Sequence, residues 1–115
     1  MNSKIKSYEL SLAADSDIEK IFDYTEQEFA FDQALKYISE LDNVFTDLVN
    51  SPGLGRKRDE IKFGLRSIVQ ESHVIFYRVL EDRIRIVRIL HVSRDIKLFV
   101  AKTLFHFYPK ENRSL

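Results

Sequence analysis

Serine and histidine side chains offer this chain few routes to nucleophilic or acid/base chemistry. Ser72 precedes His73 directly, and neighbouring residues of a strand point to opposite faces, so the two do not form a hydrolase pair. The other histidines are His91 and His106. His106 has no carboxylate or second histidine at ligand spacing, and the chain has no cysteine, so we expect no metal site and no cofactor.

Arginine side chains bind carboxylates and phosphates through paired hydrogen bonds, and this chain concentrates its basic residues in its second half. Residues 1–50 contain 4 Lys and Arg against 11 Asp and Glu, whereas residues 51–115 contain 14 against 7. A basic surface is therefore expected in a protein whose formal net charge is zero. We predict a basic loop and further basic positions, namely Arg56, Lys57, Arg58 and Arg66, then Arg78, Arg85 and Arg94.

Three uses fit this basic pattern. The residues could bind an acidic amphipathic segment of a partner protein, contact nucleic acid directly, or keep a strand edge from aggregating. Zero net charge weakens long-range attraction to DNA. We therefore favour the acidic protein partner and expect no sequence-specific binding of nucleic acid by this chain alone.

Length and composition predict one folded domain over residues 1–115, because 44% hydrophobic and 31% charged residues are typical of globular proteins. The absence of cysteine is typical of small intracellular domains. The N-terminal residues do not have the apolar core of a signal peptide, and no apolar run is long enough to cross a membrane. We expect a cytoplasmic protein without membrane contacts.

Hydrophobic periodicity predicts the elements that position these residues. A strand is expected over residues 8–12, with Leu12 on the same face as Tyr8. Apolar residues at three- and four-residue steps then predict an amphipathic helix that ends near Phe29. A second helix, with Asp32 as its N-cap, should pack against the first as a helical hairpin.

The second half of the chain predicts antiparallel strands at residues 65–70, 72–80 and 83–91. A two-residue turn at Glu81 and Asp82 would set the register of the last two strands. Strict alternation then assigns one face to the helical hairpin, with Ile75, Tyr77, Val79, Ile84 and Ile86. The other face is apolar at its centre and basic at its rim, and it carries Val74, Phe76, Arg78, Arg85, Val87, Ile89 and His91.

An apolar surface with a polar rim is the composition of a partner-binding surface, so this second face, continued by Arg94, is the predicted working face. The same register puts His73 and His91 on opposite faces, where they do not pair. A last helix is expected from Ile96, followed by a polar tail from Pro109. Its apolar stripe could cover the open sheet face, a second copy of the chain, or a groove of a partner.

Short segments spread along the chain carry a family resemblance. They are Ala13-Ala14, Asp17-Ile18, Ile21 and Tyr24 near the N-terminus, then Asp59-Glu60-Ile61 with Gly64-Leu65-Arg66, Ser72 to Tyr77, and Ile86 to His91 with Asp95. In their order and on these elements, they resemble the ParE branch of the RelE/ParE toxins of type II toxin-antitoxin systems. The resemblance covers residues 8–96, while residues 97–115, the last helix and polar tail, lie outside it.

The resemblance implies an α+β fold of the RelE/ParE type. Its order is β-α-α-β-β-β, with a helical hairpin packed on a small, mainly antiparallel twisted sheet, to which this chain adds a C-terminal helix. It also implies a toxin that arrests growth and forms a hetero-oligomer with a ParD-like antitoxin. The predicted basic-rimmed face is the expected site for that antitoxin.

The target differs between branches of this family. RelE-like members are ribosome-dependent mRNA interferases, and they need cationic and acid/base groups around the cleaved bond. Their arginine falls on Val74 here, their C-terminal tyrosine or histidine falls on Phe99 or Val100, and only Arg94 matches. ParE-like members instead resemble inhibitors of DNA gyrase that stabilise its cleaved DNA complex without catalytic residues of their own. We therefore expect a gyrase inhibitor and no enzyme, with an mRNA interferase or a non-toxic corepressor as alternatives.

Overall fold

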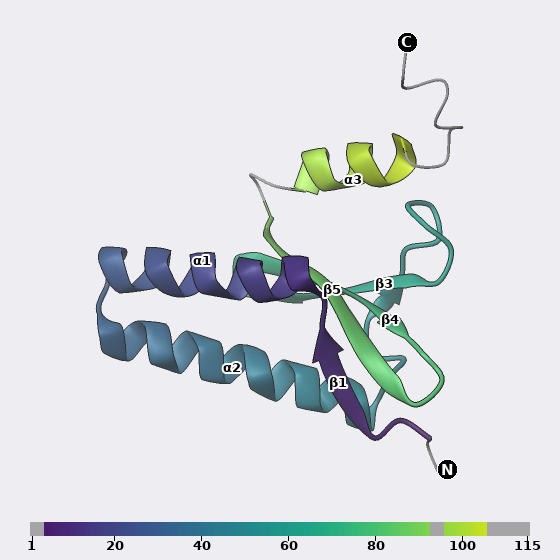
Figure 1. The fold of residues 1–115 in the computed structure, drawn as a ribbon, viewed down its shortest axis with the longest axis horizontal. Helices are drawn as coiled ribbons and strands as arrows, with labels where there is room; N and C mark the ends of the chain where they lie inside the picture. The colour runs from purple at the N-terminus through teal and green to yellow at the C-terminus, as the bar shows by residue number, and fades with distance from the viewer. Residues whose placement is uncertain (1–3, 93–95, 106–115) are drawn as a thin grey trace.

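The structure is a computed structural model that describes residues 4–92 and 96–105. Apart from one additional short strand, its elements follow the predicted α+β order (Figure 1). They are β1 (Ser7–Leu10), α1 (Leu12–Glu28), α2 (Phe31–Asn50), β2 (Arg56–Lys57), β3 (Leu65–Gln70), β4 (His73–Val79), β5 (Arg83–His91) and α3 (Ile96–Phe105). The predicted fold class is confirmed, whereas Arg94, Asp95, His106 and the polar tail lie outside the described residues.

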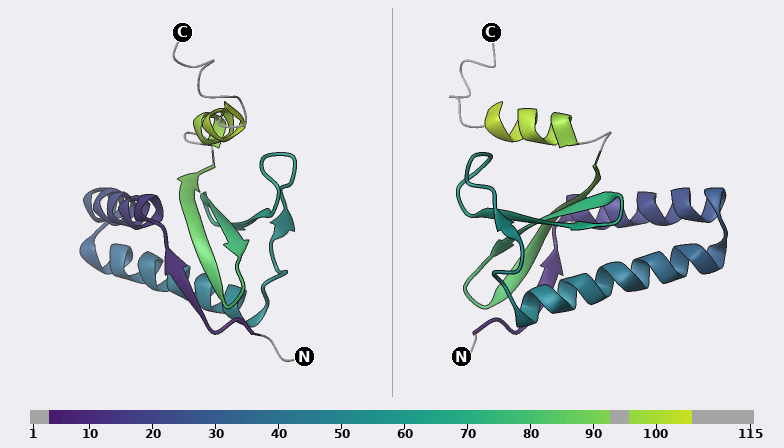
Figure 2. Two further views of the ribbon diagram at one scale, coloured as in Figure 1. Left: turned by 45° about the vertical axis from the view of Figure 1, so that its right-hand side comes forward. Right: turned by 180° about the vertical axis from the view of Figure 1, so that it is seen from behind.

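The five strands form one sheet in the order β1-β5-β4-β3-β2. Only β1 runs parallel to its neighbour β5, and the other neighbouring strands are antiparallel. The hairpin of α1 and α2 packs on one face of this sheet, and α3 lies on the opposite side (Figure 2). Of the described helices, none is long and apolar enough to cross a membrane.

The main core lies between the helical hairpin and the sheet. Its largest buried side chains include Phe45 of α2 and Tyr77 of β4, which are 2% and 0% exposed. The strands contribute the predicted residues Ile75, Tyr77, Ile84 and Ile86 to this core, whereas Val79 at the end of β4 is exposed. Periodicity therefore identified the inner face of the sheet correctly for these four residues, but not for β5 beyond Ile86.

Two predicted boundaries near the helices are wrong. Leu12 is not the last residue of the first strand but the first residue of α1, and it is 91% exposed. Ser11 is the N-cap, and its Oγ accepts a hydrogen bond of 2.9 Å from the backbone N–H of Ala14. The N-cap of α2 is Ala30. Asp32 lies inside the first turn of α2, where its negative charge interacts favourably with the helix dipole.

A bulge at Val87 changes the predicted register of β5. The two-residue turn is present, since the Leu80 N–H donates to the Arg83 carbonyl oxygen and Arg78 lies opposite Arg85. Tyr77 pairs with Ile86, but the next residue of β4, Phe76, pairs with Arg88, so Val87 is an extra residue of β5 without a partner position on β4. Every side chain beyond the bulge therefore faces the side opposite to the one that strict alternation predicts.

The bulge makes the predicted faces of Ile89 and His91 wrong. Ile89 pairs with Ile75 and lies in the main core, and His91 pairs with His73 on the hairpin side. Leu90 turns to the opposite face, where it packs beneath α3.

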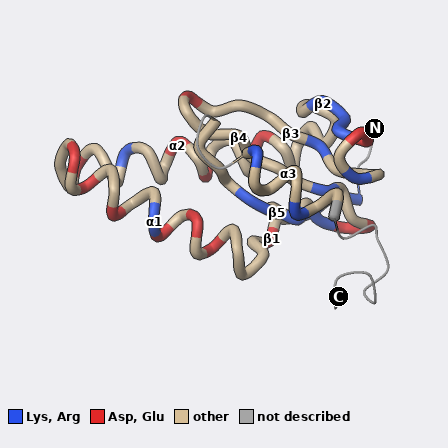
Figure 3. Tube along the Cα trace, turned by 90° about the horizontal axis from the view of Figure 1, so that it is seen from above, with Lys and Arg blue, Asp and Glu red and all other residues tan. Residues whose placement is uncertain are grey.

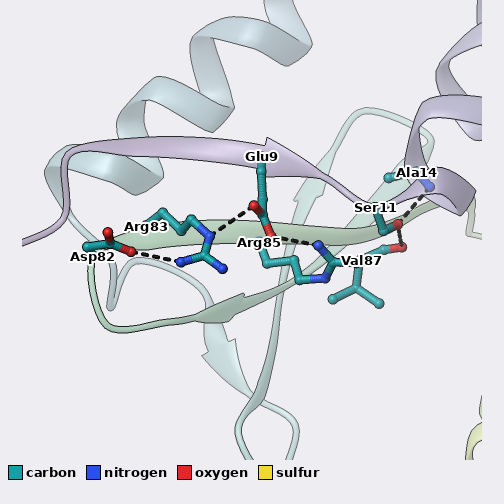
Figure 4. Close-up of polar contacts among 7 residues, drawn as sticks. All are labelled: Glu9, Ser11, Ala14, Asp82, Arg83, Arg85 and Val87. Atoms are coloured by element: carbon teal, nitrogen blue, oxygen red, sulfur yellow. Dashed lines mark hydrogen bonds and ion pairs between the residues drawn. The ribbon is translucent and has the colours of Figure 1, made fainter.

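Side chains from the start of α1 bind β5 beyond the end of β1. Ser11 Oγ donates 2.8 Å to the carbonyl oxygen of Val87 at the bulge (Figure 4). Farther along α1, the buried carboxylate of Asp17 accepts hydrogen bonds from the backbone N–H of Ile89 and from the Arg88 guanidinium. Helix α1 thus satisfies polar groups on a stretch of β5 that pairs with β4 on one side and extends past the end of β1 on the other.

Candidate partner-binding surface

The sheet face opposite the helical hairpin, which we call the open face, carries a row of arginines at one end. Arg78 and Arg85 lie directly opposite each other on β4 and β5, an arrangement that is unfavourable for like charges. Glu9 of β1 reduces this repulsion because its carboxylate accepts 2.6 Å from Arg85 and 2.9 Å from Arg83 (Figure 4). The hydrogen bonds from Arg85 and Arg83 lower the pKa of the Glu9 carboxyl from its ordinary value.

The loop before β3 holds the Arg78 guanidinium at the edge of this face. Arg78 Nη1 donates 3.2 Å to the carbonyl oxygen of Phe63. Gly64 follows with a φ of +86°, and a Cβ there would lie 3.1 Å from Arg78 Nη2. The positive φ favours glycine here, and any larger side chain would also have to displace the Arg78 guanidinium slightly. The hydrogen bond to Phe63 therefore holds the Arg78 side chain in a defined position on the open face.

The predicted basic loop is divided between the two faces of the sheet. Arg56 and Lys57 form the short edge strand β2, which the sequence had predicted as loop. Arg56 lies opposite Ser67, and Arg58 donates to the Ser67 Oγ at 3.2 Å and to Glu60 at 2.7 Å, so both arginines lie on the open face. Lys57 lies opposite Arg66 on the other face.

Arg66 is held by the chain itself, since its Nη1 donates 2.6 Å to the carbonyl oxygen of Gly55. Within the described residues, no ion pair involves Arg56 or Lys57. The basic loop therefore contributes two arginines, Arg56 and Arg58, to the open face rather than four basic residues.

The apolar centre of the open face is not exposed as the sequence predicted. Val74 and Phe76 point to this face, yet they are only 7% and 0% exposed. Helix α3 covers them, and the ring of Phe99 packs on Phe76 with centroids 4.6 Å apart. The sequence left three possible surfaces against which the apolar stripe of α3 could pack. In the structure it packs against the open sheet face. Val87 lies at the margin of this second cluster.

A cleft of about 310 Å³ lies at the β2–β3 edge of the sheet. Arg56 and Arg58 stand at its rim, and its floor includes Val74 and Val69, the latter 62% exposed. An apolar side chain flanked by carboxylates would match this combination of floor and rim. The accessible part of the predicted working face is therefore an arginine rim with a small apolar cleft.

The histidines form a pair that the sequence interpretation rejected. The rings of His73 and His91 lie across the strands with centroids 5.7 Å apart, because the bulge turns His91 to the hairpin side, where His73 lies. The Tyr37 hydroxyl donates 3.0 Å to the Gln70 carbonyl oxygen and lies 2.7 Å from His73 Nδ1. Burial, with a smaller effect of nearby acidic groups, raises the pKa of Tyr37. Across the described part of the chain, no group of three or more His, Asp or Glu side chains could hold a metal ion.

A helical hairpin on a small sheet, with an arginine-rimmed outer face, is the architecture expected of the RelE/ParE class. Within that class the chain belongs to the ParE toxins. The sequence model of the family described as "ParE toxin of type II toxin-antitoxin system, parDE" matches residues 8–96. The protein is thus a toxin of a type II toxin-antitoxin system.

Curated relatives have similar length. Toxin ParE1 of Caulobacter vibrioides is 36% identical over 93 residues, which cover 81% of this chain and 96% of the relative. Toxin ParE1 of Mycobacterium tuberculosis is 40% identical over 90 residues, which cover 77% and 92%. Among solved structures, a chain of "Chromosomal ParDE TA system from P. aeruginosa" matches with a TM-score of 0.68 at 24% identity. The match covers 79% of this chain and 100% of the solved chain, and it supports the fold.

Proposed function

We propose that this toxin inhibits DNA gyrase in the cytoplasm by stabilising the enzyme's cleaved complex with DNA, and that a ParD-like antitoxin neutralises it. The observation that carries the proposal is the chemistry at the positions where the ribonuclease branch has its catalytic groups. Val74, Phe99 and Val100 all belong to the apolar contact between α3 and the sheet. Hydrocarbon side chains cannot hold a phosphate or transfer a proton, so binding rather than bond cleavage is the activity that fits.

Gyrase inhibition also fits the surfaces. An inhibitor that stabilises a cleaved complex needs complementary contacts, and this protein carries acidic residues along its helical hairpin and basic residues on its sheet (Figure 3). The relatives named Toxin ParE1, at 36% and 40% identity, support the same branch of the family.

The proposed test is a supercoiling assay with purified DNA gyrase. Supercoiled product should decrease and linear DNA should accumulate as the toxin concentration rises. Relaxation by a topoisomerase that cuts one strand is the control and should not change. Unaltered supercoiling at a large excess of folded toxin rejects the proposal.

The antitoxin is proposed to lay an acidic amphipathic segment on the open face. Arg78 and Arg85 are adjacent there, and replacing both by Glu should weaken the complex with the cognate antitoxin several-fold, because attraction at the rim becomes repulsion. Lys36→Glu with Lys57→Glu makes the same change of charge away from that face and should have little effect. Equal affinities of the two double variants, measured by calorimetry, would place the antitoxin elsewhere.

A further inference from the structure

The end of the helical hairpin, residues 23–35, projects away from the sheet and is unusually apolar for an exposed surface (Figure 1). We call it the hairpin tip. Phe29, between the two helices, is 70% exposed, and Phe31 and Leu35 at the start of α2 are 53% and 50% exposed. Phe31 contacts Phe22 edge to face, with centroids 5.8 Å apart, so its position is defined by packing. Exposed aromatic residues that lie close together are typical of binding surfaces.

The hairpin tip is also acidic. Residues 23–35 contain four carboxylates and neither Lys nor Arg, and the carboxylates are Asp23, Glu26, Glu28 and Asp32. All four are exposed, and within the described residues no ion pair involves any of them. Figure 3 shows acidic residues along the hairpin, whereas Lys and Arg gather on the sheet.

The helix ends add to the negative potential. Helix α1 ends at Glu28 without a basic residue in its last turn, although the carbonyl groups there favour cations. Glu26 and Glu28 therefore lie where a carboxylate is unfavourable for α1. Asp32 offsets the positive N-terminus of α2 beside them. In the described part of the chain, neither Glu26 nor Glu28 forms an ion pair with a basic residue of the toxin.

A cleft adjoins the hairpin tip. It has a volume of about 390 Å³ and lies between Phe29 and Tyr24 on the helices and Glu71 at the β3–β4 turn. Glu71 has a φ of +51°, which is uncommon for a residue other than glycine, and it adds another carboxylate to the wall. Lys36 is the cation among the lining residues. The cleft can receive an apolar side chain while its rim attracts basic ones.

We propose that the hairpin tip and its cleft bind a cationic segment of the toxin's target, in which lysines or arginines flank an apolar anchor. This inference rests on the proposed function, because an enzyme that holds DNA presents basic surfaces to the phosphates. The target surface is then separate from the arginine-rimmed open face, which has the opposite charge and suits an acidic antitoxin segment. Each partner has one complementary surface on the toxin.

The test combines two variants of the full-length toxin with a matched control. Glu26→Lys with Glu28→Lys reverses the charge of the hairpin tip, and Phe29→Ser removes its most exposed aromatic ring. The control, Glu19→Lys with Asp47→Lys, makes the same change of charge at exposed positions of the same two helices away from the tip. Circular dichroism should give the wild-type spectrum for all three.

The expected result is a rise of about tenfold in the toxin concentration that half-inhibits purified DNA gyrase for the two tip variants, and no such rise for the control. Affinity for the cognate antitoxin should stay within about twofold of wild type. Full inhibition by both tip variants would overturn the inference while leaving gyrase as the target. Loss of antitoxin binding with unchanged inhibition would overturn it too, because the tip would then belong to the antitoxin. Wild-type toxin without effect on gyrase would refute the proposed function and this inference together.

Discussion

The Asp17 carboxylate is the most heavily used polar group in the junction between α1 and β5. It is 6% exposed. It accepts 2.8 Å from Arg88 Nε, 2.9 Å from Arg88 Nη2 and 2.9 Å from the backbone N–H of Ile89. Replacing Asp17 by Ala removes all three acceptor contacts at once. We therefore predict that this single change destabilises the toxin strongly.

The magnitude follows from what the substitution leaves behind. A buried N–H without a partner, here that of Ile89, costs about 1–3 kcal/mol. Removing one member of a buried ion pair costs about 3–5 kcal/mol when the remaining charge stays buried. The Arg88 side chain is 31% exposed and can regain water, so the lower part of that range applies. The two costs come from one substitution and are not additive, so we expect a total loss of about 3 kcal/mol, which lowers the Tm of a domain of this size by about 10–15 °C.

Urea denaturation followed by circular dichroism measures this loss. Asp23→Ala, an exposed acidic residue on the same helix, is the control and should change stability by less than about 0.5 kcal/mol. In a double-mutant cycle, Asp17→Ala combined with Arg88→Ala should cost at least about 1 kcal/mol less than the sum of the single changes, because either single change already removes the hydrogen bonds that the two side chains share. A cost of under about 1 kcal/mol for Asp17→Ala would refute the reasoning.

Two further predictions concern the loop before β2 and the first strand. Gly55→Ala should destabilise the folded toxin by about 1–3 kcal/mol, because the added Cβ would lie 2.7 Å from the Tyr77 hydroxyl. Gly53→Ala is the control in the same urea titration and should be neutral, because its Cβ would meet nothing within 4 Å. Burial, with a hydrogen bond to Asp42, raises the pKa of Tyr8 to about 12, so the folded toxin keeps a proton that the unfolded chain loses. Stability should therefore fall as pH rises from about 10 to about 12, and Tyr8→Phe should make this fall smaller; an identical pH dependence would contradict the assignment.

Strand positions were predicted well where side chains alternate without interruption. The predicted bounds 65–70 and 83–91 coincide with β3 and β5, because each is a run of apolar and β-branched residues that ends in turn residues. Strand β2 was missed because Arg56 and Lys57 have no strand pattern of their own. They are extended only because the edge of β3 offers partners in Ser67 and Arg66. Pairing between distant segments cannot be found from local composition.

The candidate site was predicted in part. Its rim residues Arg78 and Arg85 lie on the expected face, because the turn before β5 sets their register directly. Its centre was predicted as exposed and is covered by α3, since the sequence could not decide what would bury the apolar stripe of that helix. Glu9, which binds Arg83 and Arg85, was missed because it is far away in sequence and reaches them only through the parallel pairing of β1 with β5.

The bulge at Val87 has a cause that can be seen in the composition of β5. Arg85 points to the open face, so strict alternation would turn Arg88 inward opposite Ile75, into the core beneath the helical hairpin. An arginine buried there without a partner would be very costly. One extra residue restores Arg88 to the outer side, where Asp17 binds it, and brings Ile89 into the core instead. Two arginines three residues apart in an otherwise alternating strand therefore indicate a bulge between them. The same reasoning explains where the arginine face ends, since beyond Val87 the strand binds α1 and α3 rather than presenting a surface to a partner.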